Sequence, residues 1–367
     1  MEEWFSVADA DALDTPALVV YPDRVQHNLA QLVASIDEVG RLRPHVKTHK
    51  SQEAVRLTME AGISKFKCAT IAEAEMLGLC GAPDVLLAYQ PIGPKAARFV
   101  QVIKHYPQTK FSCLIDTYAA AQHLNNLAAA SELTVSVFID LNVGMNRSGI
   151  APAAAFALYQ QCVSLANLQI MGLHAYDGHI RDEDLALRTE HCNSAFALVE
   201  ELADQLRSTG FDPIIVAGGS PTFPIHAARQ GVECSPGTFI YWDSGYGNVC
   251  KEQPYWPAAL VLSRVISLPD ATKICVDLGH KSIAAESPLD KRITFLNAPA
   301  LRPIGQSEEH LVLEAGPNHG YKVGDLLYGL PYHICPTVAL YERAITIQNQ
   351  APAGEWKTIA RDRKINL

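Results

Sequence analysis

The sequence predicts an α/β protein in two parts, an N-terminal (β/α)8 barrel of the TIM type followed by a mostly antiparallel β domain. Strand-like runs rich in β-branched residues alternate with amphipathic helical stretches through roughly the first 240 residues. No Gly-x-Gly-x-x-Gly turn follows the first strand, which favours a closed barrel over an open doubly wound sheet, the alternative. After about Cys250 the helical periodicity largely disappears.

Eight strands are expected to build the barrel: Leu42–Val46, Lys65–Ala69, Val85–Ala88, Lys110–Leu114, Thr134–Asp140, Gln169–Ala175, Pro213–Ala217 and Glu233–Ile240. The expected helices between them include Ser51–Ala61, Ile71–Leu79, Ala119–Leu127, Pro152–Leu165 and Asp184–Ser208. Pro152 suits the first turn of its helix, where a missing N–H removes no hydrogen bond. We expect residues 15–250 to form this barrel domain.

The β domain is expected over residues 251–367, with residues 1–14 as a candidate addition. Strand-like runs at Ala258–Leu268, Lys273–Asp277 and Ala339–Ile347 lie between turns rich in Gly, Pro and Asn. A lone early strand, Ala17–Tyr21, is expected to pair with this domain rather than with the barrel.

Composition limits the partners and the compartment. A formal net charge of −9 argues against a nucleic-acid or anionic-membrane partner. Nine cysteines, an odd number without Cys-x-x-Cys spacing, do not suggest a disulfide framework. The acidic N-terminus lacks the pattern of a signal sequence, and the most apolar run is interrupted by Ser263 and Arg264. We therefore expect a cytoplasmic protein that spans no membrane.

A basic stretch inside this acidic chain is the most informative motif. Residues 43–50, Arg-Pro-His-Val-Lys-Thr-His-Lys, hold five basic or imidazole side chains. If the stretch is a strand, Lys47 points away from the apolar Val46, toward the mouth of the barrel. A lysine desolvated beside other cations is a candidate Schiff-base nucleophile. The alternative is a solvated basic surface.

A second motif, residues 140–149, follows a strand of β-branched residues, and barrel active sites lie at that end of the strands. Its Arg147 offers a fork of donors to a phenolate or carboxylate, or is simply exposed on a turn. After another strand, His174, Tyr176, Asp177 and His179 could orient a cofactor ring or act as acid and base, or be structural.

Two loops after late strands predict a phosphate site. In residues 216–222, Gly218 and Gly219 permit close backbone approach, and the hydroxyls of Ser220 and Thr222 can bind phosphate. The second loop, residues 235–238, has the sequence Ser-Pro-Gly-Thr. Late barrel loops are the usual phosphate cradle of this architecture. Together with a lysine after an early strand, they indicate a phosphorylated cofactor.

His333 and Cys335 could share one metal ion. In an extended strand, residues two apart project on the same face. Imidazole with thiolate suits Zn²⁺ best, and two protein ligands leave positions open for catalysis. The alternative is a buried cysteine beside a satisfied core histidine.

These motifs resemble the fold type III pyridoxal-phosphate enzymes, a group that includes alanine racemase and the metal-dependent D-serine dehydratases and D-threonine aldolases. The resemblance rests on residues 43–50, 144–149 and 218–222 and covers nearly the whole chain. The stretch 43–50 is similar to the dehydratase and aldolase branch, because alanine racemases differ after their lysine.

The resemblance implies a role for each motif. Lys47, not Lys50, forms the Schiff base with pyridoxal 5′-phosphate, and Arg147 contacts the phenolic side of its ring. His333 and Cys335 hold a divalent metal, for which zinc is favoured over manganese or magnesium. The residues implied around the phosphate are Gly218, Gly219, Ser220, Gly237 and Thr238. The resemblance also implies a homodimer.

The implied activity is a lyase reaction on a D-amino acid with a β-hydroxyl group. Cys335 at the metal pair resembles dehydratases, whereas many aldolases have aspartate there, so we favour a D-serine dehydratase-like enzyme. His179 resembles the aldolase side and could be the base for the hydroxyl proton. A racemase is a further alternative, with a second base from Tyr321, Tyr328 or Tyr332. A cofactor carrier without catalysis would need neither His333 nor Cys335.

Overall fold

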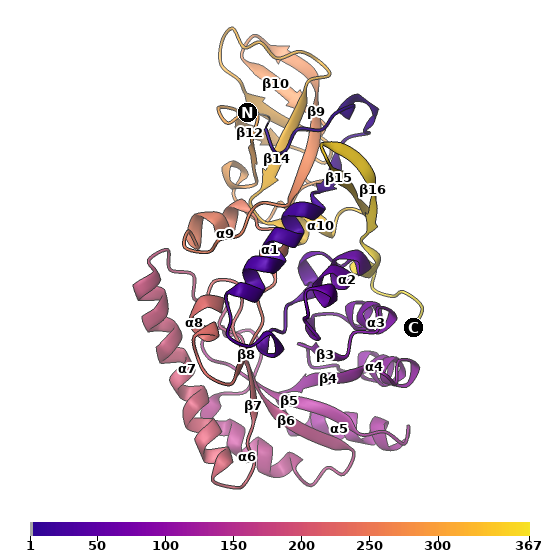
Figure 1. Ribbon diagram of the computed structural model, residues 1–367, viewed down its shortest axis with the longest axis vertical. Coiled ribbons are helices and arrows are strands. Elements are labelled where there is room, and N and C mark those ends of the chain that lie inside the picture. Colours follow the sequence, from indigo (N-terminus) through magenta and orange to yellow (C-terminus); the bar gives the residue numbers. More distant parts are fainter. Residues whose placement is uncertain (1–2) are drawn as a thin grey trace. The chain divides into compact units, whose positions relative to one another are not determined.

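The structure is a computed structural model that describes residues 3–367. The chain divides into two compact units (Figure 1). The barrel unit comprises Leu32–Lys47, Ala54–Gly237 and Asp362–Leu367. The β unit comprises residues 3–31, Thr48–Glu53 and Thr238–Arg361. The predicted domain boundaries remain a proposal, and each unit is described separately below.

Seven parallel strands form the sheet of the barrel unit, in the order β2-β3-β4-β5-β6-β7-β8. They are β2 (Lys65–Cys68), β3 (Asp84–Leu87), β4 (Lys110–Ile115), β5 (Val135–Leu141), β6 (Leu168–Ala175), β7 (Ile214–Ala217) and β8 (Val232–Cys234). Apolar side chains from four of them fill the interior: Leu86, Leu114, Phe138 and Val216. The carboxyl ends of all seven strands point the same way, which is where a barrel enzyme builds its site.

The segment 42–45 closes the ring between the first and last strands of this sheet. Leu42 bridges to Cys234 in β8, and His45 bridges to Lys67 in β2, both in parallel. The N–H of Arg43 donates to Cys234 O at 2.8 Å, and the N–H of Lys67 donates to Pro44 O at 2.9 Å. The predicted (β/α)8 barrel is therefore confirmed, with its first strand reduced to isolated bridges.

A buried ion network lies at this closure. The Arg43 side chain is only 2% exposed. Its Nε donates to Glu233 Oε2 at 2.7 Å, and its Nη1 donates to Asp84 Oδ1 at 2.5 Å. Lys65 also pairs with Glu233. The network joins the closing segment to β8 and β3, so the basic stretch begins with a structural residue.

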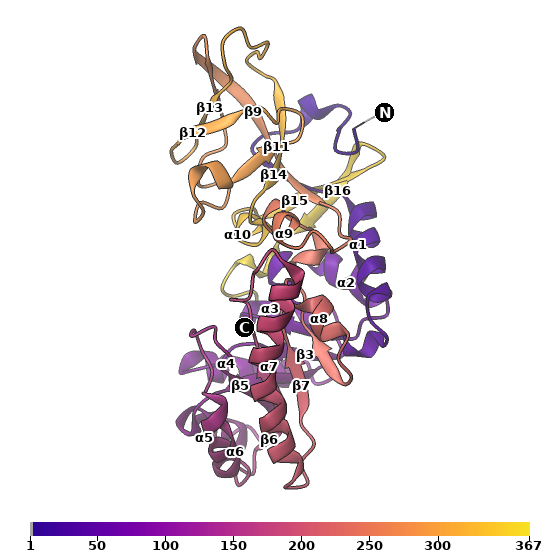
Figure 2. The ribbon, with the colours of Figure 1, turned by 90° about the vertical axis from the view of Figure 1, so that its left-hand side faces the viewer.

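The helices of the barrel unit lie outside its strands, and the longest, α7, can be followed in Figures 1 and 2. They are α2 (Gln52–Glu60), α3 (Ile71–Leu79), α4 (Pro94–His105), α5 (Tyr118–Ala129), α6 (Pro152–Cys162), α7 (Leu185–Arg207) and α8 (Phe223–Ala227). Their starts follow local sequence rules. Thr70, the N-cap of α3, accepts from the N–H of Glu73 at 3.1 Å, and the Glu73 carboxylate accepts from the N–H of Ala69, in an arrangement similar to a capping box. Asp184 caps α7 by accepting from Leu187 at 2.9 Å.

The β unit holds a nine-stranded sheet, whose long strand β9 is seen in Figure 2. Its strands are β1 (Ala17–Val20), β9 (Ala259–Asp270), β10 (Lys273–Val276), β11 (Ile293–Phe295), β12 (Arg302–Gln306), β13 (Leu311–Glu314), β14 (Leu326–Pro331), β15 (Arg343–Gln348) and β16 (Ala351–Lys357). β1 runs antiparallel to β9 and parallel to β15, so its predicted pairing is confirmed. The helices of this unit are α9 (Ser244–Val249), α10 (Ile334–Val338) and most of α1 (Pro22–Ala34), whose last turn belongs to the barrel unit.

Four local predictions are wrong. Lys47 lies in a 3₁₀ turn, η3 (Val46–Thr48), rather than on a strand. The last barrel strand ends at Cys234, and a second 3₁₀ turn, η4 (Thr238–Ile240), follows it. His333 caps α10 instead of lying on a strand, and β15 begins only at Arg343. Among residues 3–367, no helix combines the length and apolarity needed to cross a bilayer.

Candidate active site

The turn that carries Lys47 is shaped by its own histidines. The Nδ1 atom of His45 accepts from the N–H of Lys47 at 3.1 Å, and the Nδ1 atom of His49 accepts from the N–H of Ser51 at 3.2 Å. Burial lowers the pKa of His49 to about 3. Both imidazoles are buried, and Lys47 itself is half-buried. The basic stretch is therefore not a solvated surface.

Three cationic side chains of the barrel unit converge on the ring of Tyr176. Lys47 Nζ lies 5.8 Å from the ring centroid, Arg147 Cζ lies 4.9 Å from it, and Lys67 Nζ lies 5.7 Å from it. The structure thus brings together two predicted residues, Lys47 and Arg147, around a third, Tyr176. Lys67 was not predicted as a site residue, although a lysine inside a predicted strand was a usable signal.

His174 presents an unpaired ring nitrogen in the same unit. Its Nδ1 lies 2.7 Å from Asp140 Oδ1, and Asp140 Oδ2 accepts from Ser148 Oγ at 3.0 Å. Burial lowers the pKa of His174, although the bond to Asp140 opposes this. A neutral ring that donates from Nδ1 leaves Nε2 as an acceptor. In the part of the chain described, this buried Nε2 has no hydrogen-bond partner.

The two late loops meet within the barrel unit. Gly218 has φ of +77°, and a Cβ there would lie 2.6 Å from the His226 ring, so only glycine fits without strain. The N–H of Gly237 donates to Ser220 Oγ at 3.2 Å. The Thr222 hydroxyl is engaged inside the protein, because it donates to Asp177 Oδ1 at 2.8 Å.

A buried cluster of Asp177, Cys192 and His226 lies beneath these loops. Three such groups could in principle hold a metal ion. However, Asp177 Oδ2 already lies 2.8 Å from His226 Nε2, and Cys192 Sγ lies 3.4 Å from the same nitrogen. Burial raises the pKa of the Cys192 thiol to about 12. These hydrogen bonds connect Asp177, in the loop after β6, to Cys192 in α7 and to His226 in α8.

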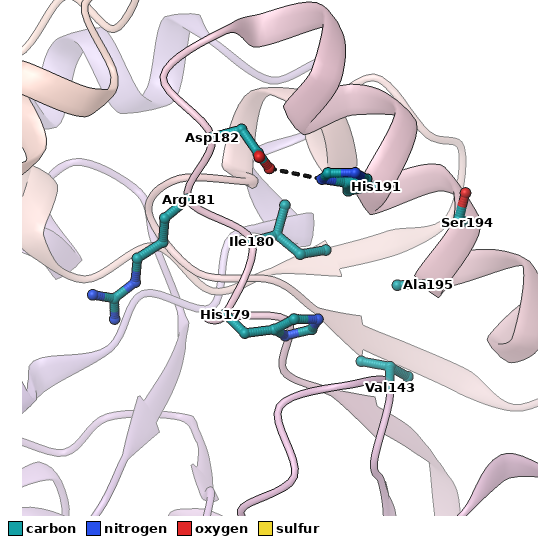
Figure 3. A pocket seen from close by; sticks show the side chains of 8 residues that line it. All are labelled: Val143, His179, Ile180, Arg181, Asp182, His191, Ser194 and Ala195. Atoms are coloured by element: carbon teal, nitrogen blue, oxygen red, sulfur yellow. Dashed lines mark hydrogen bonds and ion pairs between the residues drawn. The ribbon is translucent and has the colours of Figure 1, made fainter.

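His179 lines a pocket of about 630 Å³ in the barrel unit (Figure 3). The pocket is lined by Val143, His179, Ile180, Arg181, Asp182, His191, Ser194 and Ala195. A Cβ on Gly144 would lie 2.5 Å from His179 Nε2, so the loop after β5 leaves room for this imidazole. His179 is exposed, and the pocket lining includes none of the three cations around Tyr176.

The predicted metal pair lies in the β unit. His333 Nδ1 is 2.6 Å from Glu286 Oε1. Burial opposes protonation of His333, but hydrogen bonds to Cys335 and Glu286, with the charges of Cys335 and Asp243, raise its pKa to about 9. Cys335 Sγ lies 3.2 Å from Thr48 Oγ1 and 3.7 Å from Thr238 Oγ1. His333 and Cys335 thus interact although they lie at the start of a helix.

Asp243 supports this arrangement from the start of α9. It accepts from the N–H of Tyr246 at 2.9 Å and from the N–H of Ile334 at 3.0 Å. Burial raises the pKa of Asp243 to about 6, although both hydrogen bonds oppose the rise. Neither Asp243 nor Glu286 was predicted from the sequence, because nothing local connects them to the metal pair.

Comparison with known proteins identifies the family. Residues 20–245 match the model for the alanine racemase N-terminal domain, and residues 258–347 match one described as "Putative serine dehydratase domain". The chain belongs to the alanine racemase N-terminal-domain family. The predicted resemblance to fold type III pyridoxal-phosphate lyases of D-β-hydroxy amino acids is therefore confirmed.

The relatives include both an aldolase and a dehydratase. The chain is 26% identical to the D-threonine aldolase of Arthrobacter sp, over 95% of this chain and 93% of that protein. It is also 26% identical to the D-threo-3-hydroxyaspartate dehydratase of Delftia sp. strain HT23, over 95% of this chain and 97% of that protein. In fold, it resembles the crystal structure of D-threonine aldolase from Filomicrobium marinum, with a TM-score of 0.87, 24% identity and 98% coverage of both chains.

Proposed function

We propose that this protein is a pyridoxal 5′-phosphate- and divalent-metal-dependent D-serine dehydratase-like lyase, which converts a D-β-hydroxy amino acid to a keto acid and ammonia. One observation carries the proposal. The sulfur of Cys335 contacts the hydroxyl of Thr48, the residue that directly follows Lys47 in the chain. The turn that bears the cofactor-binding lysine therefore also contacts the metal pair.

The residues of the barrel unit fit the cofactor. Lys47 would bind its aldehyde, Arg147 its phenolic oxygen, and His174 and Tyr176 its ring. The unpaired, buried Nε2 of His174 supports this fit, since a buried acceptor without a partner calls for a ligand. The cations around Tyr176 supply positive charge for an anionic group.

The late loops would hold the phosphate. We propose that backbone N–H groups and the Ser220 hydroxyl make the contacts, whereas Thr222 shapes the loop through Asp177. The residues assigned to the phosphate are Gly218, Gly219, Ser220, Thr222, Gly237 and Thr238. Thr238 lies near Cys335, so its hydroxyl is also a candidate support for the metal pair.

The metal pair has the chemistry of a catalytic zinc site. Glu286 fixes Nδ1 of His333 and leaves the other ring nitrogen for coordination, a common outer-shell arrangement. Imidazole and thiolate favour Zn²⁺ over Mn²⁺ or Mg²⁺, and two protein ligands leave positions for a substrate. When bound, such an ion acts as a Lewis acid on the β-hydroxyl group.

The side chains of the barrel unit would have separate roles in the reaction, one in proton transfer and the others in holding the cofactor. The bound cofactor supplies a ring that delocalises the charge left at Cα. The Lys47 amine is the base that takes the Cα proton, because it is the side chain at the cofactor aldehyde. Arg147 keeps positive charge beside the phenolic oxygen, and the Asp140–His174 pair holds the ring in place.

Aldolase activity is the second candidate. It requires a base for the hydroxyl proton, and the exposed imidazole of His179 lines a pocket large enough for a small molecule. Racemase activity requires a second base facing the cofactor. Tyr328 is an unsuitable base because its ring is buried in the β-unit core and its hydroxyl accepts from the N–H of Val7 at 3.2 Å. Tyr321 and Tyr332 remain candidates.

Separate assays of the products distinguish these activities. The purified protein, loaded with pyridoxal 5′-phosphate and Zn²⁺, is incubated with D-serine, D-threonine and D-threo-3-hydroxyaspartate. Keto acid with ammonia is the expected result, and chelation should abolish it until Zn²⁺ or Mn²⁺ is restored. Glycine with aldehyde would replace the dehydratase proposal with the aldolase. L-enantiomer formed without metal would support the racemase.

We also propose a homodimer in the cytoplasm, with no nucleic-acid partner. The homodimer follows from the family resemblance, and the absence of a nucleic-acid partner follows from the acidic composition. The cytoplasm is proposed because the nine cysteines do not suggest a disulfide framework. Size-exclusion chromatography with light scattering tests the dimer directly. A monomer that is fully active with D-serine would overturn it.

A further inference from the structure

Lys67 is a charged residue of the barrel mouth to which the proposed reaction gives no role. Its side chain is only 2% exposed, on β2. Its N–H donates to Pro44 O at 2.9 Å, and it bridges to His45. The sheet therefore holds Lys67 beside the segment that carries Lys47. Its Nζ lies 5.7 Å from the centroid of the Tyr176 ring, close to the 5.8 Å of Lys47 Nζ.

The nearby carboxylates are committed elsewhere. Asp140 bonds to His174 through Oδ1 and to Ser148 through Oδ2. Asp177 bonds to Thr222 through Oδ1 and to His226 through Oδ2. Within residues 3–367, no hydrogen bond or ion pair to Lys67 Nζ is found. A buried ammonium group without an anionic partner is unfavourable.

The electrostatics agree with the geometry. Burial, followed by the charge of Lys47, lowers the pKa of Lys67 to about 7, although the charges of Asp177 and Asp140 oppose the change. An anion placed between these lysines would favour the charged form of both. The stability of the fold does not account for a lysine here, because an apolar side chain of the same length would fill the position without the free-energy cost of burying an unpaired amine.

We propose that Lys67 is a third cationic binding residue of the active site, which contacts an anionic oxygen of the bound ligand. The oxygen belongs either to the phenolate of the cofactor or to the carboxylate of the amino acid. The proposal rests on the proposed function, since it requires that this mouth binds the cofactor. Lys67 positions the ligand, and binding at mildly alkaline pH is accompanied by uptake of a proton on its amine.

Binding measurements on Lys67→Met test the proposal. Lys110→Met is the matched control, because Lys110 is an exposed lysine at the start of β4 in the same unit. The probe for the phenolate is 4-deoxypyridoxine 5′-phosphate, which lacks the aldehyde and so reports non-covalent contacts alone. The probe for the carboxylate is D-alanine, compared with D-alaninamide, titrated into the cofactor-loaded proteins and followed by absorbance.

We expect Lys67→Met to weaken one of these two ligands by at least about 10-fold, the value of one lost charge-assisted hydrogen bond. Weaker binding of the deoxy analogue assigns the phenolate. Weaker binding of D-alanine, with D-alaninamide unchanged, assigns the carboxylate. Calorimetry in two buffers at pH 8 should show that the parent protein takes up a proton that Lys67→Met does not.

The failures are distinguishable. If Lys67→Met binds both ligands within about twofold of the parent, with equal proton uptake, Lys67 has no such role and the lyase proposal stands. If the parent itself does not bind the deoxy analogue, both proposals fail. Circular dichroism verifies folding, and Lys67→Gln replaces Lys67→Met if the methionine variant aggregates. Lys67→Arg, which keeps the charge, should restore part of the affinity.

Discussion

The buried network that closes the barrel gives the sharpest prediction about stability. Glu233 is 5% exposed and accepts from Arg43 at 2.7 Å. Glu233→Ala leaves the buried Arg43 with Asp84 as its one remaining carboxylate. Removing one partner from a buried ion pair costs about 3–5 kcal/mol. Because Asp84 remains, we expect the free energy of unfolding to fall by an amount near the lower end of this range, about 3 kcal/mol.

The protein offers two separate probes for this measurement. All four tryptophans, Trp4, Trp242, Trp256 and Trp356, lie in the β unit. Tryptophan fluorescence therefore reports unfolding of the β unit, whereas far-ultraviolet circular dichroism includes the barrel helices. In urea, the Glu233→Ala transition followed by circular dichroism should shift to lower concentration without a change of slope.

The control is Lys65→Ala, which removes the other cation on the same carboxylate. Lys65 is partly exposed, and such pairs contribute about 0–1 kcal/mol. A loss for Glu233→Ala no larger than that for Lys65→Ala would refute the argument that burial makes the Arg43 network decisive. Replacing both partners, as Arg43→Met with Glu233→Leu, should recover much of the stability, since no unpaired charge then remains between them.

Three further predictions concern the site. Lys47→Ala should abolish the absorbance band that bound pyridoxal phosphate gives near the visible–ultraviolet border, whereas Lys50→Ala should retain it; a band that survives in Lys47→Ala would overturn the assignment. Cys335→Ala should keep the cofactor but lose zinc, measured by elemental analysis, and turnover; full activity in the metal-free variant would exclude the Lewis-acid role. Without cofactor, Lys67→Met should be more stable than the parent at pH 7 and below by up to about 5 kcal/mol, because the pKa falls from 10.5 to about 7 at about 1.4 kcal/mol per pH unit. Between pH 7 and pH 10.5, Lys67 is protonated in the unfolded parent and neutral in the folded parent. The stability difference between Lys67→Met and the parent should therefore shrink as the pH rises to 10.5. A pH-independent stability difference would contradict this prediction.

Sequence patterns located the elements whose signals are local. The helix predicted at Ile71–Leu79 has those bounds in the structure, and its start has a local signal, since the Thr70 hydroxyl caps the N–H of Glu73 three residues later. The strand predicted at Lys110–Leu114 extends by one residue to Ile115. Short-range rules were sufficient here, since each signal lies within four residues of the boundary it marks.

The same rules fail where distant residues decide the structure. His333 and Cys335 were predicted to lie on a strand, but they lie at the start of a helix. Pro336 suits the first turn of a helix and is the local signal that favoured the helix over the strand. Glu286 lies 47 residues before the histidine that it orients. Lys67 becomes significant only when barrel closure brings it beside the basic stretch. Its role follows from the absence of a partner for Nζ among the described residues, which depends on the fold and not on the neighbouring sequence.

The chain itself couples the two halves of the proposed chemistry. Lys47 is the last residue of a segment of the barrel unit, and Thr48 is the first of a segment of the β unit. Consecutive Cα atoms are about 3.8 Å apart across a trans peptide, whatever the rest of the molecule does. The amine proposed to bind the cofactor and the hydroxyl that contacts Cys335 of the metal pair are therefore on neighbouring residues. The proposed function therefore assigns the imine and the metal ligand to groups that are connected through one peptide bond and the Thr48–Cys335 contact.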